Sequence, residues 1–494
     1  MSTNFSPENL SIETTLSGVK TVRDGARSLL SRSHPWVEAE KLLSAAGLTV
    51  DVPLMIIGDF LGYGTAAAFK SGRQTVLTVY PEKRFLTESV WNGPGETTFF
   101  AAADFEEKIN RFLSLKNIAV WEMPAAAPYY ENERNRLHLL IKKSMQEQLA
   151  NDTVEAAFSR SWLSNALRFF QESRRSIGML QADLNTPILI AAPGPSLEAV
   201  IPSIIRYRER FLLTAVTSAA AVLQSHGIRA DFYFAVDPGF YARKLCLFLN
   251  PPVCGWILPP TANVPASNAA AVPFRQNLPP ETAGGSFWNT ENFPLLPEMP
   301  TVTASAFLFF QFFKQKAFAG LDLTAPAGKP YARGHLAIQE AHLTACRLSP
   351  AENRFLTGEH TRPLSVFKDL FTETTKRIGV KPIRLCAPVK DNAVFCEEDT
   401  SWFESLPANP IKATAFAAVP QLQKAISEAA QNFLTESIEQ VSRIQTAAEV
   451  DALPAAVRAA AFREAIRARN NISSAKEFQK TALRRLKRWQ NRVR

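Results

Sequence analysis

The sequence has little of what marks exported or membrane-spanning proteins. Its first thirty residues are polar and mixed in charge, without the apolar segment of a secretory signal. The most apolar stretch, residues 304–313, contains Gln311 and ends before Lys314, so we expect a buried helix there. Five cysteines occur and none forms a CxxC pair, which favours reduced thiols over disulfides. These absences predict a cytoplasmic protein with no membrane span.

Metal-binding and common nucleotide-binding motifs are also missing. The six histidines show no HExxH pattern, and no P-loop or GxSxG turn is present. His335 and His342 lie seven residues apart, but two histidines make a poor zinc site. We therefore expect no metal.

Positive charge is concentrated at the end of the chain. Residues 451–494 carry twelve Lys or Arg against three acids, an excess that equals the net charge of +9 for all 494 residues. A cluster of this kind can contact nucleic acid, a membrane or an acidic partner. A solvated face of a terminal helix is the simpler interpretation, and we predict no nucleic-acid partner.

Strands alternate with helices in two blocks of the sequence. In the first, "VPLMIIGDFLGYGTAAAF" (52–69) has the pattern of strand, glycine turn and helix; in the second, "TPILIAAPGPS" (186–196) begins a similar series. This alternation predicts an α/β fold with parallel sheets covered on both faces. We expect a loose leader (1–35), a Rossmann-like N-terminal domain (36–150), a helical linker (151–185), a central α/β domain (186–345) and a mostly helical C-terminal domain (346–494).

The loop Ala192–Ser196 follows an apolar strand and precedes a helix. Ligands of parallel sheets bind beyond the carboxyl ends of the strands, and a helix N-terminus favours phosphate. Gly194 would allow close approach of an anion, with the amides of Gly194 and Ser196 as donors. Ser196 fits a plain N-cap equally well.

Two later strands end in polar residues as well. Thr217, Ser218 and Ala219 open a helix after one strand, where hydroxyls bind a base or ribose or cap the helix. Asp237 follows another strand and precedes Pro-Gly, a sequence typical of turns and of carboxylates that meet a substrate. In the N-terminal block the Gly58 turn is a weaker signal, because Tyr80 stands where an acid would hold a ribose. We favour a structural turn there.

Three segments together resemble a known family. "APGPSLE" (192–198), "TSAAAVLQSHGIRADFYFAVDPG" (217–239) and "GLDLTAPAGKPYARGH" (320–335) occur in the order found in motility-associated factor (Maf) glycosyltransferases. That family shares its core with MptE-like 6-hydroxymethylpterin diphosphokinases. "SRSHPWVEAEKLL" (31–43) resembles its opening segment. The resemblance implies a Rossmann-like N-terminal domain and a central domain similar to the bacterial sialyltransferase fold. Pro193, Thr217, Ala230 and Leu321 depart from the family pattern.

The resemblance also implies a reaction. Members of the family transfer a nonulosonic acid, pseudaminic or legionaminic acid, from its CMP-activated form to Ser or Thr of flagellin, with no required cofactor. The resemblance places the donor nucleotide against Gly194, Pro195, Ser196, Thr217, Ser218 and Ala219. The candidates for catalytic groups are Asp237, Asp322 and His335.

Two alternatives stay open at this point. A pterin diphosphokinase would use ATP and magnesium, with Asp237 and Asp322 near the phosphates. A flagellin-binding, chaperone-like protein would keep the fold without catalysis.

Overall fold

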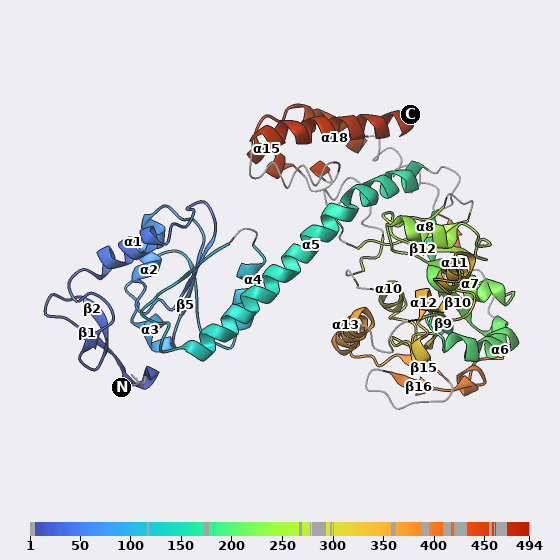
Figure 1. Cartoon of the computed structure of the whole chain (residues 1–494), viewed down its shortest axis with the longest axis horizontal. Coiled ribbons are helices and arrows are strands. Elements are labelled where there is room, and N and C mark those ends of the chain that lie inside the picture. The colour runs from blue at the N-terminus through green and yellow to red at the C-terminus, as the bar shows by residue number, and fades with distance from the viewer. Residues whose placement is uncertain are drawn as a thin grey trace. The chain divides into compact units, whose positions relative to one another are not determined.

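The computed structural model describes residues 5–493 except 116–117, 172–176, 181, 266–268, 277, 279–292, 297–298, 300, 357–361, 387–394, 409–415, 419–431, 454–456, 459 and 461–471. The chain divides into two compact units, Met1–Thr153 and Val154–Arg494. A long helix, α5 (Glu131–Gln171), runs through the boundary between them (Figure 1).

The N-terminal unit contains a four-stranded parallel sheet with the strand order β6-β5-β4-β7. The strands β4 and β5 are buried along their whole length, as apolar strands of a sheet covered on both faces should be. The predicted alternation of strand and helix is confirmed. Its elements are α1 (Pro35–Ala45), β4 (Leu54–Ile57), α2 (Tyr63–Lys70), β5 (Val76–Tyr80), α3 (Lys83–Thr87), β6 (Glu96–Phe99), α4 (Phe105–Leu113) and β7 (Ala119–Glu122).

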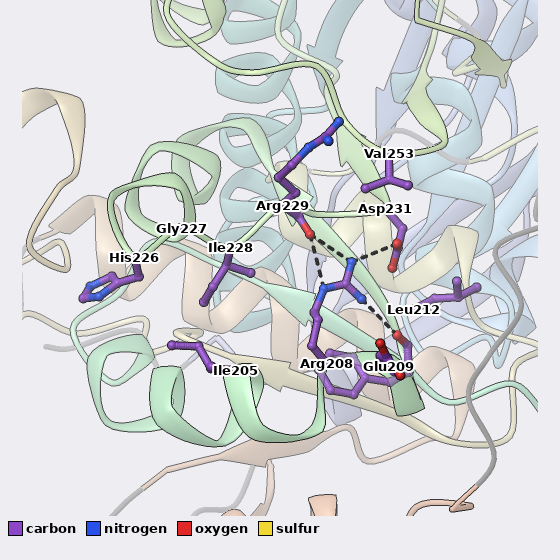
Figure 2. Close-up of a pocket in the computed structure, with 11 residues that line it drawn as sticks. Ile205, Arg208, Glu209, Leu212, His226, Gly227, Ile228, Arg229, Asp231 and Val253 are labelled. Carbon is purple, nitrogen blue, oxygen red and sulfur yellow. Dashed lines mark hydrogen bonds and ion pairs between the residues drawn. The ribbon is translucent and has the colours of Figure 1, made fainter.

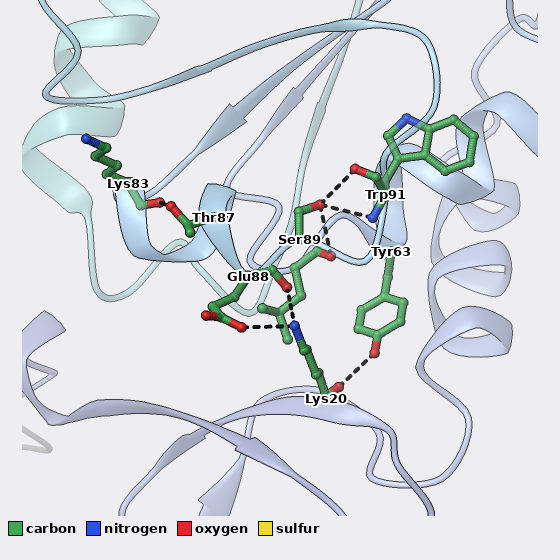
Figure 3. Close-up of polar contacts among 8 residues, drawn as sticks. Lys20, Tyr63, Lys83, Thr87, Glu88, Ser89 and Trp91 are labelled. Carbon is green, nitrogen blue, oxygen red and sulfur yellow. Dashed lines mark hydrogen bonds and ion pairs between the residues drawn. The ribbon is translucent and has the colours of Figure 1, made fainter.

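Residues 1–35 do not form the loose leader expected from the sequence. A short 3-10 turn, η1 (Pro7–Asn9), precedes an antiparallel sheet of β1 (Leu10–Thr14), β2 (Lys20–Asp24) and β3 (Arg27–Ser28). The Nζ atom of Lys20 lies 2.9 Å from Glu88 Oε2, and the Tyr63 hydroxyl donates to the carbonyl of Lys20 at 2.8 Å (Figure 3). Val22 is fully buried in the core of the unit. Burial of these few apolar side chains orders a segment whose overall composition is polar.

The second unit contains an eight-stranded sheet in which every pair is parallel. Its strand order is β13-β12-β11-β10-β9-β14-β15-β16. The chain builds outward from β9 to β13 and then returns to the other side of β9 with β14. The strands are β9 (Ile188–Ala191), β10 (Leu212–Val216), β11 (Phe232–Phe234), β12 (Gly255–Leu258), β13 (Ala271–Pro273), β14 (Lys316–Ala319), β15 (Ile383–Leu385) and β16 (Cys396–Glu398).

Helices connect and cover these strands (Figure 1). The apolar helix expected at residues 304–313 is α10 (Val302–Phe309), which packs on β9 and β10 with most of its side chains buried. The other helices beside the sheet are α6 (Leu197–Tyr207), α7 (Thr217–Ser225), α8 (Phe240–Cys246), α11 (Leu336–Leu343), α12 (Glu352–Phe355) and α13 (Arg362–Ile378). In the described residues no helix is both long and apolar enough to cross a membrane.

The central domain extends beyond its predicted limit at residue 345. β16 continues the sheet from the domain expected to be mostly helical, and β15 lies in its segment "PIRLCAP", where the sequence allows a strand. β12 and β13 lie within residues 251–300, where the sequence is rich in Pro, Asn and Ala and has no clear period. These strands are three or four residues long, too short to give a clear period in the sequence. The predicted linker also contains a strand, β8 (Gly178–Leu180), which pairs with β17 (Phe416–Ala418).

The last part of the chain is helical, as predicted. α15 (Ala447–Ala452) packs against α18 (Ile472–Val493). Phe478, Ala482 and Leu486 recur every four residues on the buried side of α18, and its exposed side carries the cations Lys476, Lys480, Arg484, Lys487 and Arg488.

Candidate functional site

The loops after β9 and β14 meet where the strand order reverses. The Gly194 amide donates to the carbonyl of Gly320 at 2.8 Å, and the Ser196 amide donates to Asp322 Oδ2 at 2.9 Å. The second bond joins residues 126 positions apart in the sequence. The sheet therefore brings three predicted site residues, Gly194, Ser196 and Asp322, into one place at its carboxyl edge, where doubly wound folds bind ligands.

Glycine is required at two positions of this contact. A Cβ atom at position 194 would lie 2.3 Å from Asp322 Oδ2 and 2.5 Å from the carbonyl oxygen of Gly320. At position 320, where φ is +76°, it would lie 2.1 Å from the carbonyl oxygen of Ala192. Either side chain would push the two loops apart.

The loop amides are already in use, which corrects the expectation that they would hold a phosphate. Pro193 and Pro195 have no N–H, and the amides of Gly194 and Ser196 donate to the β14 loop. The carboxylate of Asp322 thus stands at the start of α6 and accepts the Ser196 amide in place of a ligand. These two amides therefore have no free N–H with which to bind a phosphate.

The hydroxyl of Ser196 remains available. Ser196 is the N-cap residue of α6, but its side chain makes no capping bond, and its backbone is helical (φ −64°, ψ −16°) rather than in the extended conformation of a capping residue. Its Oγ atom is buried and has no hydrogen-bond partner among the residues that the structure describes. A buried hydroxyl without a partner is costly unless a ligand or water completes it. The plain N-cap that the sequence also allowed is not what the structure shows.

His335 lies beside the same loop. The Ala332 amide donates to the Pro193 carbonyl at 2.8 Å, and the Arg333 amide donates to Glu198 Oε1 at 2.8 Å, so the segment before His335 is fastened to the α6 loop. The imidazole is 2% exposed and stacks on Tyr331, with ring centroids 3.9 Å apart. It is therefore held in a fixed, nearly dry position.

The hydrogen bonds of His335 define its protonation state. Burial lowers its pKa to about 4, against an opposing effect of Glu340, so the ring is neutral near pH 7. Nδ1 accepts a hydrogen bond from the Ala337 amide at 3.2 Å and caps α11. The single ring proton then resides on Nε2, which is buried and has no partner within the described residues. This geometry makes His335 a hydrogen-bond donor to a ligand rather than a base.

This burial predicts a pH dependence of stability. Because the folded-state pKa of His335 is about 4 and the ordinary value is 6.5, the unfolded chain binds the proton first as the pH falls. The stabilisation is complete above about pH 6.5 and is lost progressively toward pH 4. We expect the wild type to lose about 2 kcal/mol more unfolding free energy than His335→Asn between pH 7 and pH 5. Urea unfolding at the two pH values measures this difference, and equal losses in both proteins would contradict it.

Asp237 lies three residues after the end of β11, a strand two spacings (about 10 Å) from β9. Its side chain is exposed, and Oδ1 accepts a hydrogen bond from the Gly239 amide at 2.6 Å. The second carboxylate oxygen has no hydrogen-bond partner in the described part of the chain. Of the three predicted catalytic groups, Asp237 is the most exposed, since Asp322 is half-buried and His335 is buried.

The remaining predicted residues lie between these two points. Thr217, Ser218 and Ala219 form the first turn of α7, after β10, which separates β9 from β11. Thr217 is 6% exposed, and Ala219 is fully buried and offers a ligand at most its backbone. Ser218 is half-buried, so its side chain is the most accessible of the three.

Asp231, which belongs to one of the segments that carry the family resemblance, lies at the opposite edge of the sheet, where the strands begin. It accepts hydrogen bonds from the Arg208 guanidinium at 2.8 Å and from the Leu213 amide at 2.7 Å, and thereby ties the amino ends of β10 and β11 together (Figure 2). A cavity of about 630 Å³ lies here, lined by His226, Arg229 and Val253 among others. This cavity is remote from the loops at the carboxyl edge.

In the glycine turn of the N-terminal unit, the side chain of Asp59 accepts the backbone amides of the turn. Asp59 is 1% exposed and accepts hydrogen bonds from the amides of Gly62 at 3.0 Å and Thr65 at 2.8 Å. Burial raises the pKa of this carboxyl despite those bonds. The hydroxyl of Tyr80 lies 2.9 Å from Ser89 Oγ. The amides that a nucleotide phosphate would use are thus engaged, in keeping with a structural turn.

The second unit is therefore a doubly wound α/β domain, and two buried donors beside its strand reversal have no partner in the described part of the chain. A sequence profile described as 6-hydroxymethylpterin diphosphokinase MptE-like matches residues 160–250. The matched residues run from the end of α5 through α8, within the region where the sequence motifs resemble that core. Asp322 and His335 lie beyond the matched residues.

Two known proteins are similar to this chain. The structure of the Maf glycosyltransferase from Magnetospirillum magneticum AMB-1 shares its fold, with a TM-score of 0.57 and 12% sequence identity over 98% of this chain and 91% of that chain. An uncharacterized protein from Treponema pallidum (strain Nichols) is 25% identical over 113 residues, 23% of this chain. The match spans about half of that relative, 54% of its length. The fold similarity agrees with the Maf resemblance of the sequence.

Proposed function

We propose that the chain is a glycosyltransferase that moves a nonulosonic acid from its CMP-activated form to a Ser or Thr hydroxyl of flagellin in the cytoplasm. One observation carries the proposal: two buried neutral donors, Ser196 Oγ and His335 Nε2, have no partner among the described residues and belong to segments joined at the strand reversal, and the exposed carboxylate of Asp237 follows β11 at the same edge of the sheet. The fold similarity to a Maf glycosyltransferase supports the same reaction class.

The geometry suggests a role for each group. A CMP-sugar has one phosphate as its leaving group, and donors aimed at the charge that develops there lower the barrier. Ser196 and His335 would supply these donors, and Thr217 and Ser218 would contact the nucleotide between them. Asp237 would take the proton of the acceptor hydroxyl. The hydroxyl oxygen would then bond the anomeric carbon while the bond from that carbon to the phosphate oxygen breaks. CMP then leaves with the bonding electrons.

The pterin diphosphokinase reading has a specific observation behind it, the description of the matching profile. That reaction requires carboxylates that hold magnesium on the phosphates of ATP. Asp322 is engaged with the Ser196 amide, and Asp237 follows a strand two positions away from β9. No set of three potential ligand side chains converges within the described residues. The two carboxylates therefore favour the transferase.

Ligand binding distinguishes the two enzymes. We expect CMP to raise the melting temperature of the full chain by several degrees, because a ligand at 100 times its Kd contributes about 2.7 kcal/mol. ATP with magnesium should leave the melting temperature unchanged, and Ser196→Ala should reduce the shift by CMP. A shift with ATP and magnesium alone would overturn the proposal in favour of the kinase.

Intact-mass analysis of flagellin tests the transfer itself. Flagellin from cells with this protein should be heavier by whole nonulosonic acid residues than flagellin from cells without it. Unchanged mass with lower flagellin abundance would instead establish the chaperone-like alternative.

A further inference from the structure

The turn that carries Asp237 is fastened in an unusual way. Its three consecutive backbone carbonyls each accept a hydrogen bond from an asparagine. The Asn263 amide donates to Asp237 O at 3.0 Å, Asn165 Nδ2 donates to Pro238 O at 3.1 Å, and Asn263 Nδ2 donates to Gly239 O at 3.1 Å. Asn165 comes from α5 and Asn263 from the loop after β12, so two distant segments hold one turn.

The two asparagines belong to one closed network. Asn165 Nδ2 also donates to the carbonyl of Thr261 at 2.9 Å, which links the loop after β12 to the turn after β11. Arg168 Nη2 donates to Asn165 Oδ1 at 3.1 Å and to Asn263 Oδ1 at 2.8 Å. Asn165 is 5% exposed. Every donor and acceptor of its amide is thus used, a condition under which a buried polar network is rigid.

An exposed Asp-Pro-Gly turn does not need this support to form. The bond from the Gly239 amide to Asp237 Oδ1 closes the turn by itself, as such turns do elsewhere. The extra bonds fix the main chain from Asp237 to Gly239, next to a side chain that is exposed. A fixed orientation of an exposed carboxylate favours a reaction in which that carboxylate must contact a reacting group.

We propose that Asn165 and Asn263 are positioning residues that hold the carboxylate of Asp237 for the acceptor hydroxyl. The proposal rests on the proposed function for its chemistry, but the clamp itself can be tested separately. Asn165 lies in the segment that the sequence assigned to a linker, and no motif marks it.

Hydrogen exchange tests the clamp without reference to activity. In the full chain, Asn165→Ala should speed exchange of the Gly239 and Asn263 amides about tenfold or more, because local opening no longer breaks the Asn165 bonds. Exchange in β9 and α6 should stay as in the wild type. Gln224→Ala is the matched control, since Gln224 similarly bonds the carbonyl of Phe248 and the amide of Asn250, outside the Asp237 turn. It should leave Gly239 unchanged. Unaltered exchange at Gly239 in Asn165→Ala would overturn the clamp.

A double-mutant cycle tests the positioning role. Asn165→Ala alone should lower kcat about tenfold with little change in the KM for the CMP-sugar. In the Asp237→Asn background the same change should lower kcat less than about twofold, because no catalytic carboxylate remains to be positioned. Independent, multiplying losses would show a merely structural role and overturn the positioning proposal. A wild-type chain that transfers no sugar would refute the proposed function instead, and the exchange result would then still decide whether the clamp exists.

Discussion

Asp237→Asn is expected to lower kcat for sugar transfer by about 10²- to 10⁴-fold, the usual contribution of a general base. Asparagine keeps the side-chain oxygen that accepts from the Gly239 amide, so the turn persists. Because the residue is exposed, the free energy of unfolding should change by less than about 0.5 kcal/mol. Steady-state transfer from a CMP-sugar to flagellin, together with urea unfolding, measures both quantities.

Asp183→Asn provides the matched control for this experiment. Asp183 is also exposed, and its Oδ1 accepts from the Asn185 amide at 2.8 Å in the same kind of turn, but it precedes β9 rather than following a strand of the site. Its substitution should leave kcat unchanged. A loss of less than about threefold in Asp237→Asn would remove Asp237 as the base and leave Asp322 as the carboxylate to examine.

The parts of the fold that the sequence predicted well are those whose signal is local. β4, β5, β9 and β10 are runs of four or five apolar residues buried on both faces, each followed by a turn and a helix. The strands that it missed, such as β12 and β13, are three or four residues long and owe their strand geometry to their neighbours in the sheet. β2 is ordered by side chains of the N-terminal unit that lie far away in the sequence. Non-local pairing of this kind leaves no period to detect.

In the candidate site, too, the sequence predicted local features but not those that depend on contacts between distant segments. The motifs identified Gly194, Ser196 and Asp322 as candidates. They did not show that Asp322 accepts the Ser196 amide, because that contact arises from the pairing of β14 with β9. His335 was a candidate base on its residue type alone. Its capping bond to Ala337 and its burial, which fix the proton on Nε2, are properties of the fold. Asn165 was overlooked because a polar residue in an amphipathic helix usually faces solvent.

His335→Asn is expected to lower kcat about 10²- to 10³-fold, the effect of removing one hydrogen-bond donor from a developing anion. Asparagine is a good N-cap residue, so its side-chain oxygen can replace Nδ1 as the acceptor for the Ala337 amide. The substitution therefore removes the Nε2 donor but keeps the start of α11. His335→Ala should lose the same activity and in addition about 1 kcal/mol of stability, because the cap is lost.

The comparison of these two variants separates catalysis from folding. His226→Asn is the control for removing an imidazole, since His226 is exposed at the amino edge of the sheet, away from the loops of the site. It should retain full activity. If His335 acts as a donor, kcat should fall by the same factor between pH 7 and pH 5 in the wild type and in His335→Asn, because the imidazole is already neutral above pH 5. Were His335 the base, kcat in the variant would no longer fall as the pH is lowered.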